Sequence, residues 1–215
     1  MPSTVTLSDY ITQTRRLLHD ANGNFYSDAE LTDYINEARK RLIRDTGALR
    51  SYQTSTVTTN QESYSIGTLV GVSDRTMDIL NINLIWGNTR IPLRYLPWTQ
   101  FNAELRFWQN YVGRPIAFSM YGPSTFYIAP IPDQDYAIEM DTVLLPTDLS
   151  TSSPNETIDD SYISPVAYYA ASVAKYKEQS FGESELFKQE YVKKVQNVLV
   201  GTMTRRMPDP YSTPY

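Results

Sequence analysis

The spacing of apolar residues changes twice along this chain, and this change limits the possible folds more than any other feature of the sequence. In residues 1–50 apolar side chains recur every three or four positions, which places them on one face of a helix. From Ser51 they alternate with polar side chains, as in a strand with one buried face. After residue 157 the helical spacing returns. The pattern predicts helical ends around a β-rich middle.

Two helices joined by a short loop are expected at the start of the chain. Thr6 or Ser8 can cap the first helix, and Asn22-Gly23 ends it. Ser27 begins a capping box that starts the second helix, and Gly47 stands where a C-cap is expected. The apolar faces consist of Leu7, Ile11, Thr14 and Leu18 in the first helix and of Leu31, Ile35, Ala38 and Leu42 in the second. Such a pair predicts an antiparallel helical hairpin.

The middle of the chain predicts strands and one short helix. Leu80, Ile82, Leu84 and Trp86 alternate with asparagines, and Gly87-Asn88 then offers a tight turn into a second strand, which predicts a hairpin. Apolar residues at helical spacing within 98–110 predict a helix that interrupts the sheet. Further strands are expected at 52–58, 64–66, 116–120, 125–129 and 136–144.

The last third predicts a second helical hairpin and an extended tail. Small and apolar residues recur at helical spacing from Val166 to Ala174 and from Phe187 to Thr202. Three prolines favour an extended conformation for residues 207–215, the C-terminal arm. The sequence therefore predicts an α+β fold. Its helical body comprises 1–50 and 158–206, and a β-rich, antiparallel domain with one short helix, 51–157, is inserted in it.

Charge is distributed unevenly. Residues 1–50 are neutral, residues 51–160 carry five arginines and twelve acids for a net charge of −7, and residues 161–215 carry +2. A middle segment this acidic repels phosphates, which argues against a sequence-reading nucleic-acid binder. The basic clusters lack interleaved aromatics and are expected to be solvated or subunit-facing; they are Arg39, Lys40, Arg41, Arg44, Arg205 and Arg206.

The composition provides few of the residues that catalytic sites commonly use. The chain has no cysteine and one histidine, which excludes thiolate and multi-histidine metal sites. His19 lies where an imidazolium suits a helix C-terminus, and no phosphate-binding or nucleophile-elbow motif is present. Asp20 starts a run like a calcium loop, but Phe25 and Leu31 replace the glycine and glutamate that such a loop needs. We therefore expect no enzyme, no metal and no cofactor.

Neither a membrane nor a secretory segment is expected. No apolar run approaches the roughly 18 residues of a membrane span. Residues 1–6 have neither a basic n-region nor an apolar h-region.

One enzymatic alternative uses paired carboxylates. Two acids about 5–9 Å apart can cleave a glycosidic bond, and the aromatic-rich middle could stack a sugar. The candidates are Glu104, Asp133, Asp135, Glu139 and Asp141. A tail-associated glycan (peptidoglycan) hydrolase is therefore one alternative function. A glycan-binding or fibre-docking module with an exposed Trp or Tyr platform is another.

Four motifs resemble a known family. They read FYSDAELxxYINEA at 25–38, GRP at 113–115, FYIAPIPD at 126–133 and PVAYYAA at 165–171. Together, over about residues 7–200, they resemble the head-to-tail connector (adaptor) proteins of tailed bacteriophages, best the podoviral tail-tube A type.

This resemblance implies a structural virion protein of the tail or neck, assembled in the host cytoplasm. Such adaptors form a ring, typically of twelve copies, beneath the portal protein. They extend the DNA channel without sequence-specific binding and present a platform for the tail nozzle or tail fibres. On this basis we expect contacts with the portal or a neighbouring copy at Arg205, Arg206, Tyr211 and Tyr215.

Overall fold

A computed structural model describes residues 4–106, 111–150 and 156–206, the last five of these by their backbone only. The chain divides into two compact units, which are described separately below. Residues 1–49 together with 146–215 form the helical unit, and Arg50–Leu145 form the β unit.

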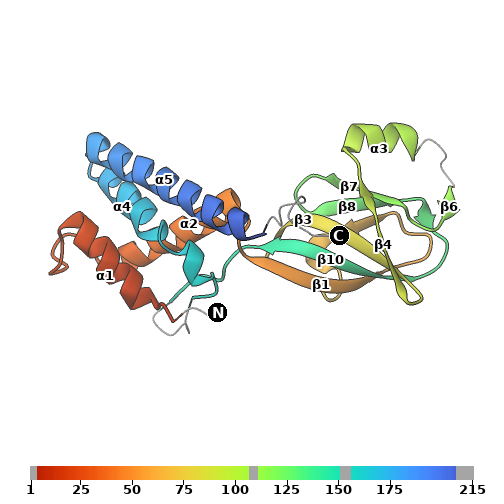
Figure 1. Ribbon diagram of the computed structural model, residues 1–215, viewed down its shortest axis with the longest axis horizontal. Helices are drawn as coiled ribbons and strands as arrows, with labels where there is room; N and C mark the ends of the chain where they lie inside the picture. Colours follow the sequence, from red (N-terminus) through yellow and green to blue (C-terminus); the bar gives the residue numbers. More distant parts are fainter. Residues whose placement is uncertain (1–3, 107–110, 151–155, 207–215) are drawn as a thin grey trace, which may run out of the picture. The chain divides into compact units, whose positions relative to one another are not determined.

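Four α-helices make up the described part of the helical unit (Figure 1). They are α1 (Leu7–Leu18), α2 (Asp28–Thr46), α4 (Val166–Lys177) and α5 (Phe181–Arg206), with a short 3₁₀ helix η2 (Asp160–Tyr162) before α4. Helix α4 contacts each of the other three α-helices. Its buried face includes four alanines, Ala167, Ala170, Ala171 and Ala174, whose small side chains let neighbouring helices approach closely.

Local capping explains where the first two helices begin and end. The hydroxyl of Thr6, not that of Ser8, caps α1, and the side chain of Asp9 accepts a hydrogen bond from the backbone N–H of Thr6 at 2.8 Å. Ser27 caps α2 at its start, and Gly47 ends it in the left-handed conformation. Helix α1 ends earlier than Asn22-Gly23, at His19, because this residue itself adopts the left-handed conformation with φ of 56°.

The β unit contains two four-stranded sheets and one two-stranded sheet. Its strands are β1 (Arg50–Val57), β2 (Ser63–Ser65), β3 (Thr76–Trp86), β4 (Thr89–Pro92), β5 (Arg94–Tyr95), β6 (Val112–Gly113), β7 (Ala117–Tyr121), β8 (Thr125–Ala129), β9 (Ile131–Pro132) and β10 (Tyr136–Leu144). The sheet orders are β1-β10-β3-β4, β2-β8-β7-β5 and β6-β9. The unit also holds η1 (Ile66–Thr68) and α3 (Trp98–Glu104).

One hydrophobic core joins the two larger sheets. Ile82 and Ile138 from the first sheet and Phe118 and Phe126 from the second are each at most 1% exposed and belong to the same cluster. Most strand pairs are antiparallel, as predicted, but β5–β7 and β6–β9 are parallel. The prediction of a purely antiparallel domain was therefore incomplete. Short strands that follow long connections can also pair in parallel.

A bulge changes the predicted alternation along β3. Ile79 pairs with Thr142 and Asn81 with Asp141, so Leu80 is left between them without a partner. Because this extra residue shifts the side-chain alternation, Ile79 is buried while Leu80 is 41% exposed. The prediction that Leu80 lies on the buried face with Ile82 was wrong for this reason.

The α+β fold class predicted from sequence is confirmed. The second boundary of the β unit lies at Leu145–Pro146, earlier than residue 157, because contacts to α2 hold the described residues of 146–158 in the helical unit. No helix in the described ranges is both long and apolar enough to cross a membrane.

Candidate functional site

A buried ion pair holds the helical unit together. Arg39 on α2 and Glu156 have fully buried side chains, with the Nη2 of Arg39 2.5 Å and its Nε 2.6 Å from the two carboxylate oxygens. Tyr10 on α1 donates its hydroxyl to the same carboxylate at 2.9 Å. The backbone N–H groups of Thr157 and Ile158 complete the set at 2.7 and 3.1 Å. This network therefore ties α1, α2 and the segment before α4 to one another.

The network lowers the pKa of Glu156 and raises that of Tyr10. Burial acts to raise the pKa of Glu156, but the hydrogen bonds and charge of Arg39 outweigh it, so this pKa lies below its ordinary value. Burial and the adjacent Glu156 carboxylate raise the pKa of the Tyr10 hydroxyl. Glu156 is therefore ionised and Tyr10 neutral at neutral pH.

The sequence prediction for Arg39 was wrong. Arg39 was grouped with a solvated or subunit-facing cluster, yet it is fully buried. A signal was present in the spacing, because Arg39 follows Ile35 by four positions and precedes Leu42 by three, which puts it on the apolar face of α2. Lys40, Arg41 and Arg44 are not buried.

Helix α5 is anchored along its first half. The Ser184 hydroxyl donates to the carbonyl O of Ser172 on α4 at 2.8 Å, and the Tyr191 hydroxyl donates to Asp45 on α2 at 2.7 Å. Tyr191 is 3% exposed and packs edge-on against the ring of Tyr169. Burial, followed by the hydrogen bond to Asp45, raises the pKa of Tyr191. One side of α5 is thus fixed to the rest of the helical unit.

Several apolar side chains of α5 are exposed. Phe181, Leu186 and Val192, which we call the outer surface of α5, are between 45% and 63% exposed. Tyr176, near the end of α4, is 66% exposed and its ring contacts that of Phe181. Scattered exposed apolar residues are normal, but several along one helix are typical of a surface that a partner covers.

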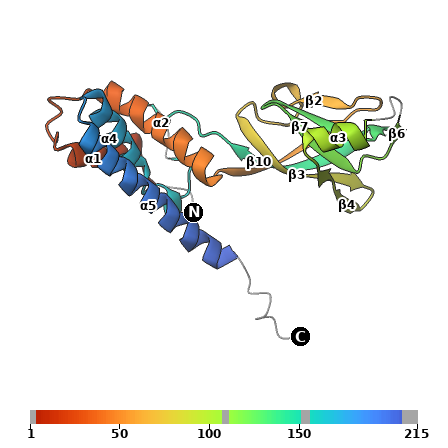
Figure 2. The ribbon, with the colours of Figure 1, turned by 90° about the horizontal axis from the view of Figure 1, so that it is seen from above.

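The residues predicted to contact partners follow this helix. Arg205 and Arg206 form the last turn of α5, where the structure describes their backbone, while Tyr211 and Tyr215 lie outside the described residues. Helix α5 has 26 residues against 12 in α4, so its C-terminal turns continue past the end of its hairpin partner (Figure 2). At about 1.5 Å per residue it is about 39 Å long.

The candidate glycosidase carboxylates are all engaged in structural contacts. Glu139 lies 2.6 Å from the Nε of Arg90 and also accepts a hydrogen bond from Tyr52. The hydrogen bond from Arg90, followed by that from Tyr52, lowers the pKa of Glu139, whereas a general acid needs a raised one. The other contacts are Asp133 with Tyr136 (2.5 Å), Asp135 with Thr59 (2.8 Å), Glu104 with Gln100 (2.9 Å) and Asp141 with Arg50 (3.8 Å).

One aromatic cluster of the β unit consists of the half-buried Trp98 and Tyr127 and the exposed Tyr121. The ring of Trp98 lies 4.6 Å from that of Tyr121 and 4.8 Å from that of Tyr127, centroid to centroid. Arg106 stacks over Trp98 at 5.3 Å and pairs with Glu62 at 2.7 Å. Tyr121 remains 55% exposed. A sugar-binding platform receives no further support from this cluster.

The β unit carries less negative charge than the sequence predicted for the middle of the chain. Six arginines and eight acids give the β unit a net charge of −2, so most of the acidity expected for the middle of the chain belongs to residues 146–160 of the helical unit. Within the described part of the chain, no three His, Cys, Asp or Glu side chains lie together as metal ligands would.

These features, polar groups that tie segments of the chain together and exposed apolar residues along α5, are typical of the class of proteins that assemble with other chains. The model of the SU10 adaptor protein family matches residues 5–213, so the chain belongs to that family. The match confirms the resemblance to phage head-to-tail adaptors and identifies the chain as a structural component of a phage virion. The podoviral tail-tube A subtype stays a prediction. No curated protein matches the sequence.

Proposed function

We propose that this protein forms a ring, of twelve copies, that docks beneath the portal, extends the DNA channel and supports the tail nozzle and tail fibres. The observation that carries the proposal is the family match, which spans both units and most of the C-terminal arm. The outer surface of α5 supports it, because burying its exposed apolar side chains against a second protein is favourable.

A ring follows from head-to-tail contacts. A surface that binds a different surface on the next copy produces a closed ring when the rotation between copies closes. The outer surface of α5 carries exposed apolar residues, whereas α2 presents charged residues, among them Lys40, Arg41 and Arg44. The chain thus offers two different surfaces, as head-to-tail contacts between copies require.

The net charge suits a channel through which DNA passes without sequence-specific binding. The whole chain carries −5, and the β unit contributes −2 to this. Acidic walls repel the phosphates and limit adhesion. Reversing the charge of residues that line the channel should then slow DNA ejection, and unchanged retention and ejection would contradict this part of the proposal.

The contacts with the portal or a neighbouring copy are assigned to the end of α5 and to the arm, at Arg205, Arg206, Tyr211 and Tyr215. Two arginines in the last turn favour a carboxylate-bearing partner, because their guanidinium groups bind carboxylates in a bidentate geometry. Tyrosine supplies contact area at a small cost in conformational entropy.

The test is the native mass of the full-length protein, alone and mixed with its cognate portal ring. A multi-copy complex with the portal supports the proposal, and a protein that stays monomeric in the presence of the portal overturns it. Truncation after Thr204, or the pair Arg205→Ala and Arg206→Ala, should abolish attachment while the helical circular dichroism is retained.

The control is Arg16→Ala in α1. Arg16 is exposed, so this variant removes a positive charge away from α5 and the arm. Equal losses in both variants would show that general charge, not the end of α5, governs attachment.

A further inference from the structure

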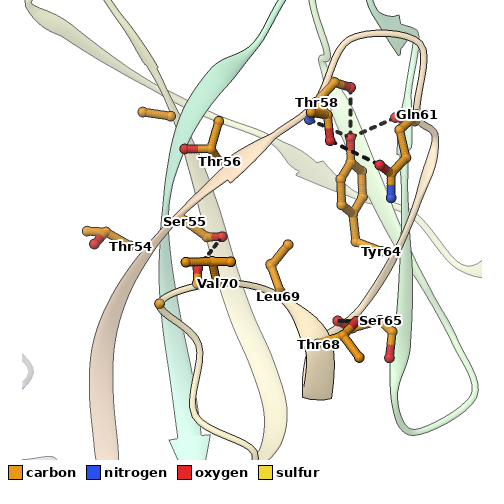
Figure 3. A pocket seen from close by; sticks show the side chains of 12 residues that line it. Thr54, Ser55, Thr56, Thr58, Gln61, Tyr64, Ser65, Thr68, Leu69 and Val70 are labelled. Carbon is orange, nitrogen blue, oxygen red and sulfur yellow. Dashed lines mark hydrogen bonds between the residues drawn. The ribbon is translucent and has the colours of Figure 1, made fainter.

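A groove opens beside the edge of the first sheet in the β unit (Figure 3). Its volume is about 630 Å³, and it lies between β1 and the segment from β2 to Gly71. None of the twelve residues that line it is charged, and half of them are serines or threonines. The groove is therefore suited to an uncharged polypeptide rather than to DNA or a phosphate.

Strand β1 is the outermost strand of its sheet, so one side of its backbone lacks a neighbouring strand. A Cβ added to Gly71 would lie 2.3 Å from the carbonyl O of Thr54, so this carbonyl points away from β10. The N–H of Thr58 also points away, because it donates to the Tyr64 hydroxyl at 3.0 Å. Thr56 lies between them with the same orientation, since alternate residues of a strand direct their backbone groups to the same side.

Gly71 and Tyr64 mark the two ends of this open edge. Among the described residues outside the sheets, none makes a backbone hydrogen bond with Thr56. The other wall is held in place, because the Ser55 hydroxyl donates to the carbonyl O of Val70 at 2.7 Å. Four steps of about 3.4 Å separate Thr54 from Thr58, so the edge between Gly71 and Tyr64 is about 14 Å long, with the outward backbone groups of Thr56 at its centre.

The opposite edge of the same sheet is closed to strand addition. The N–H of Leu93 donates to Ile82 of β3 at 2.8 Å, which directs the backbone of Ile91 to β3 and that of Arg90 and Pro92 outward. Proline has no N–H to donate, and a charged residue next to it further protects an edge. The sheet thus has one protected edge and one open edge.

The C-terminal arm has the proline spacing of a strand that pairs on one side only. Its prolines are at 208, 210 and 214, so in an extended chain every missing N–H falls on the same side. Asp209, Tyr211 and Thr213 keep their N–H groups on the other side. The arm contains a single charged side chain, that of Asp209, in agreement with the uncharged groove.

We propose that the C-terminal arm of one copy adds to the open edge of β1 in a neighbouring copy, with the 209, 211 and 213 side of its backbone toward Thr56. This rests on the ring of the proposed function. Strand addition gives affinity through backbone hydrogen bonds, and the arm then presents its proline side outward and ends the sheet. Each copy is in this way tied to the next.

The test uses cross-linking between full-length copies, because the natural chain has no cysteine. One tagged copy carries Thr56→Cys and a differently tagged copy carries Tyr211→Cys, and a short bis-maleimide joins thiols that lie close together. We expect at least a tenfold higher yield of the mixed product than with Asn88→Cys, an exposed residue in the β3–β4 turn, in place of Thr56→Cys.

Two adjacent proline substitutions provide the sharper comparison. Ser212→Pro falls on the proline side and should leave the yield within twofold, whereas Thr213→Pro removes an N–H that faces β1 and should lower it tenfold or more. Thr68→Trp, at an exposed position in the wall of the groove, should lower it similarly. Equal effects of the two proline variants, equal yields at positions 56 and 88, or cross-links only within one chain would overturn the inference.

The native mass of the same samples with portal separates the two proposals. A multi-copy complex without the cross-link shows that the ring exists and that the arm binds elsewhere, so only this inference fails. A monomer without the cross-link shows that both are wrong.

Discussion

Replacing Arg39 by methionine removes four hydrogen bonds from the interior of the helical unit. Two go to the Glu156 carboxylate, at 2.5 and 2.6 Å, and the others go to Asn36 and to the carbonyl O of Thr147, at 3.0 and 2.7 Å. Methionine fills much of the space but leaves Glu156 buried without its counter-charge. Breaking a buried pair in this way costs about 3–5 kcal/mol.

That loss is a large part of the stability of a typical domain, about 5–15 kcal/mol. The free energy of unfolding of a small domain falls by about 2 kcal/mol for each molar of urea. The urea concentration at the unfolding midpoint of the helical unit should therefore fall by about 1.5–2.5 M. Two probes separate the units. All three tryptophans, Trp86, Trp98 and Trp108, belong to the β unit, so their fluorescence reports its unfolding, while circular dichroism at 222 nm reports mainly the helices.

The neighbouring Lys40 provides the control. It forms an ion pair with Asp148 at 2.7 Å in which both side chains are at least 36% exposed, so Lys40→Met should cost under about 1 kcal/mol. Adding Glu156→Gln to Arg39→Met removes the unpaired charge, and the double variant should be more stable than the sum of the single effects by about 1 kcal/mol or more. A loss below about 1 kcal/mol for Arg39→Met, or equal shifts with both probes, would refute the reasoning.

The pH dependence gives an independent check. Because the pKa of Glu156 is lower in the folded protein than in the unfolded chain, its contribution is complete above the unfolded value of about 4.3 and is lost as the pH falls through the folded value. Without Arg39 this contribution is absent. The stability difference between the natural protein and Arg39→Met should therefore narrow below about pH 4.

Three further substitutions test local features of the two units. Gly71→Ala should destabilise the β unit by about 1–3 kcal/mol because of the positive φ of 82° alone, and the added Cβ also clashes with Thr54. The control is Gly67→Ala, whose added Cβ has no atom within 4 Å and which should not lower the midpoint of unfolding of the β unit measured by fluorescence. Thr6→Ala should cost the helical unit about 1 kcal/mol through loss of the α1 cap, measured by circular dichroism; an equal loss in Ser8→Ala would contradict the cap assignment. Tyr191→Phe should cost about 1.5–3 kcal/mol through its lost hydrogen bond to Asp45 in the same assay, and a midpoint within error of the natural protein would show that this bond does not anchor α5.

The start and end of individual helices could be predicted because capping depends on residues within four positions of one another. Ser27 and Gly47 bound α2 as predicted, and Leu31, Ile35, Ala38 and Leu42 are all buried. The same holds for the hairpin turn at Gly87-Asn88, which joins β3 and β4. The family was likewise recognisable from motifs in the sequence, and the match over residues 5–213 confirms it.

Features that join distant parts of the chain needed the tertiary structure. Arg39 finds its partner 117 residues away, and nothing near Glu156 in the sequence indicates that the two charges are buried together. The exposure of Leu80 depends on a bulge against β10, about 60 residues further along the chain, which no local pattern encodes. Which side of β1 is open likewise depends on β10, about 80 residues further along the chain, which pairs with the other side. Helix caps, turns and the spacing of side chains are determined by short stretches of sequence. Burial and strand order depend on which distant segments of the chain come into contact.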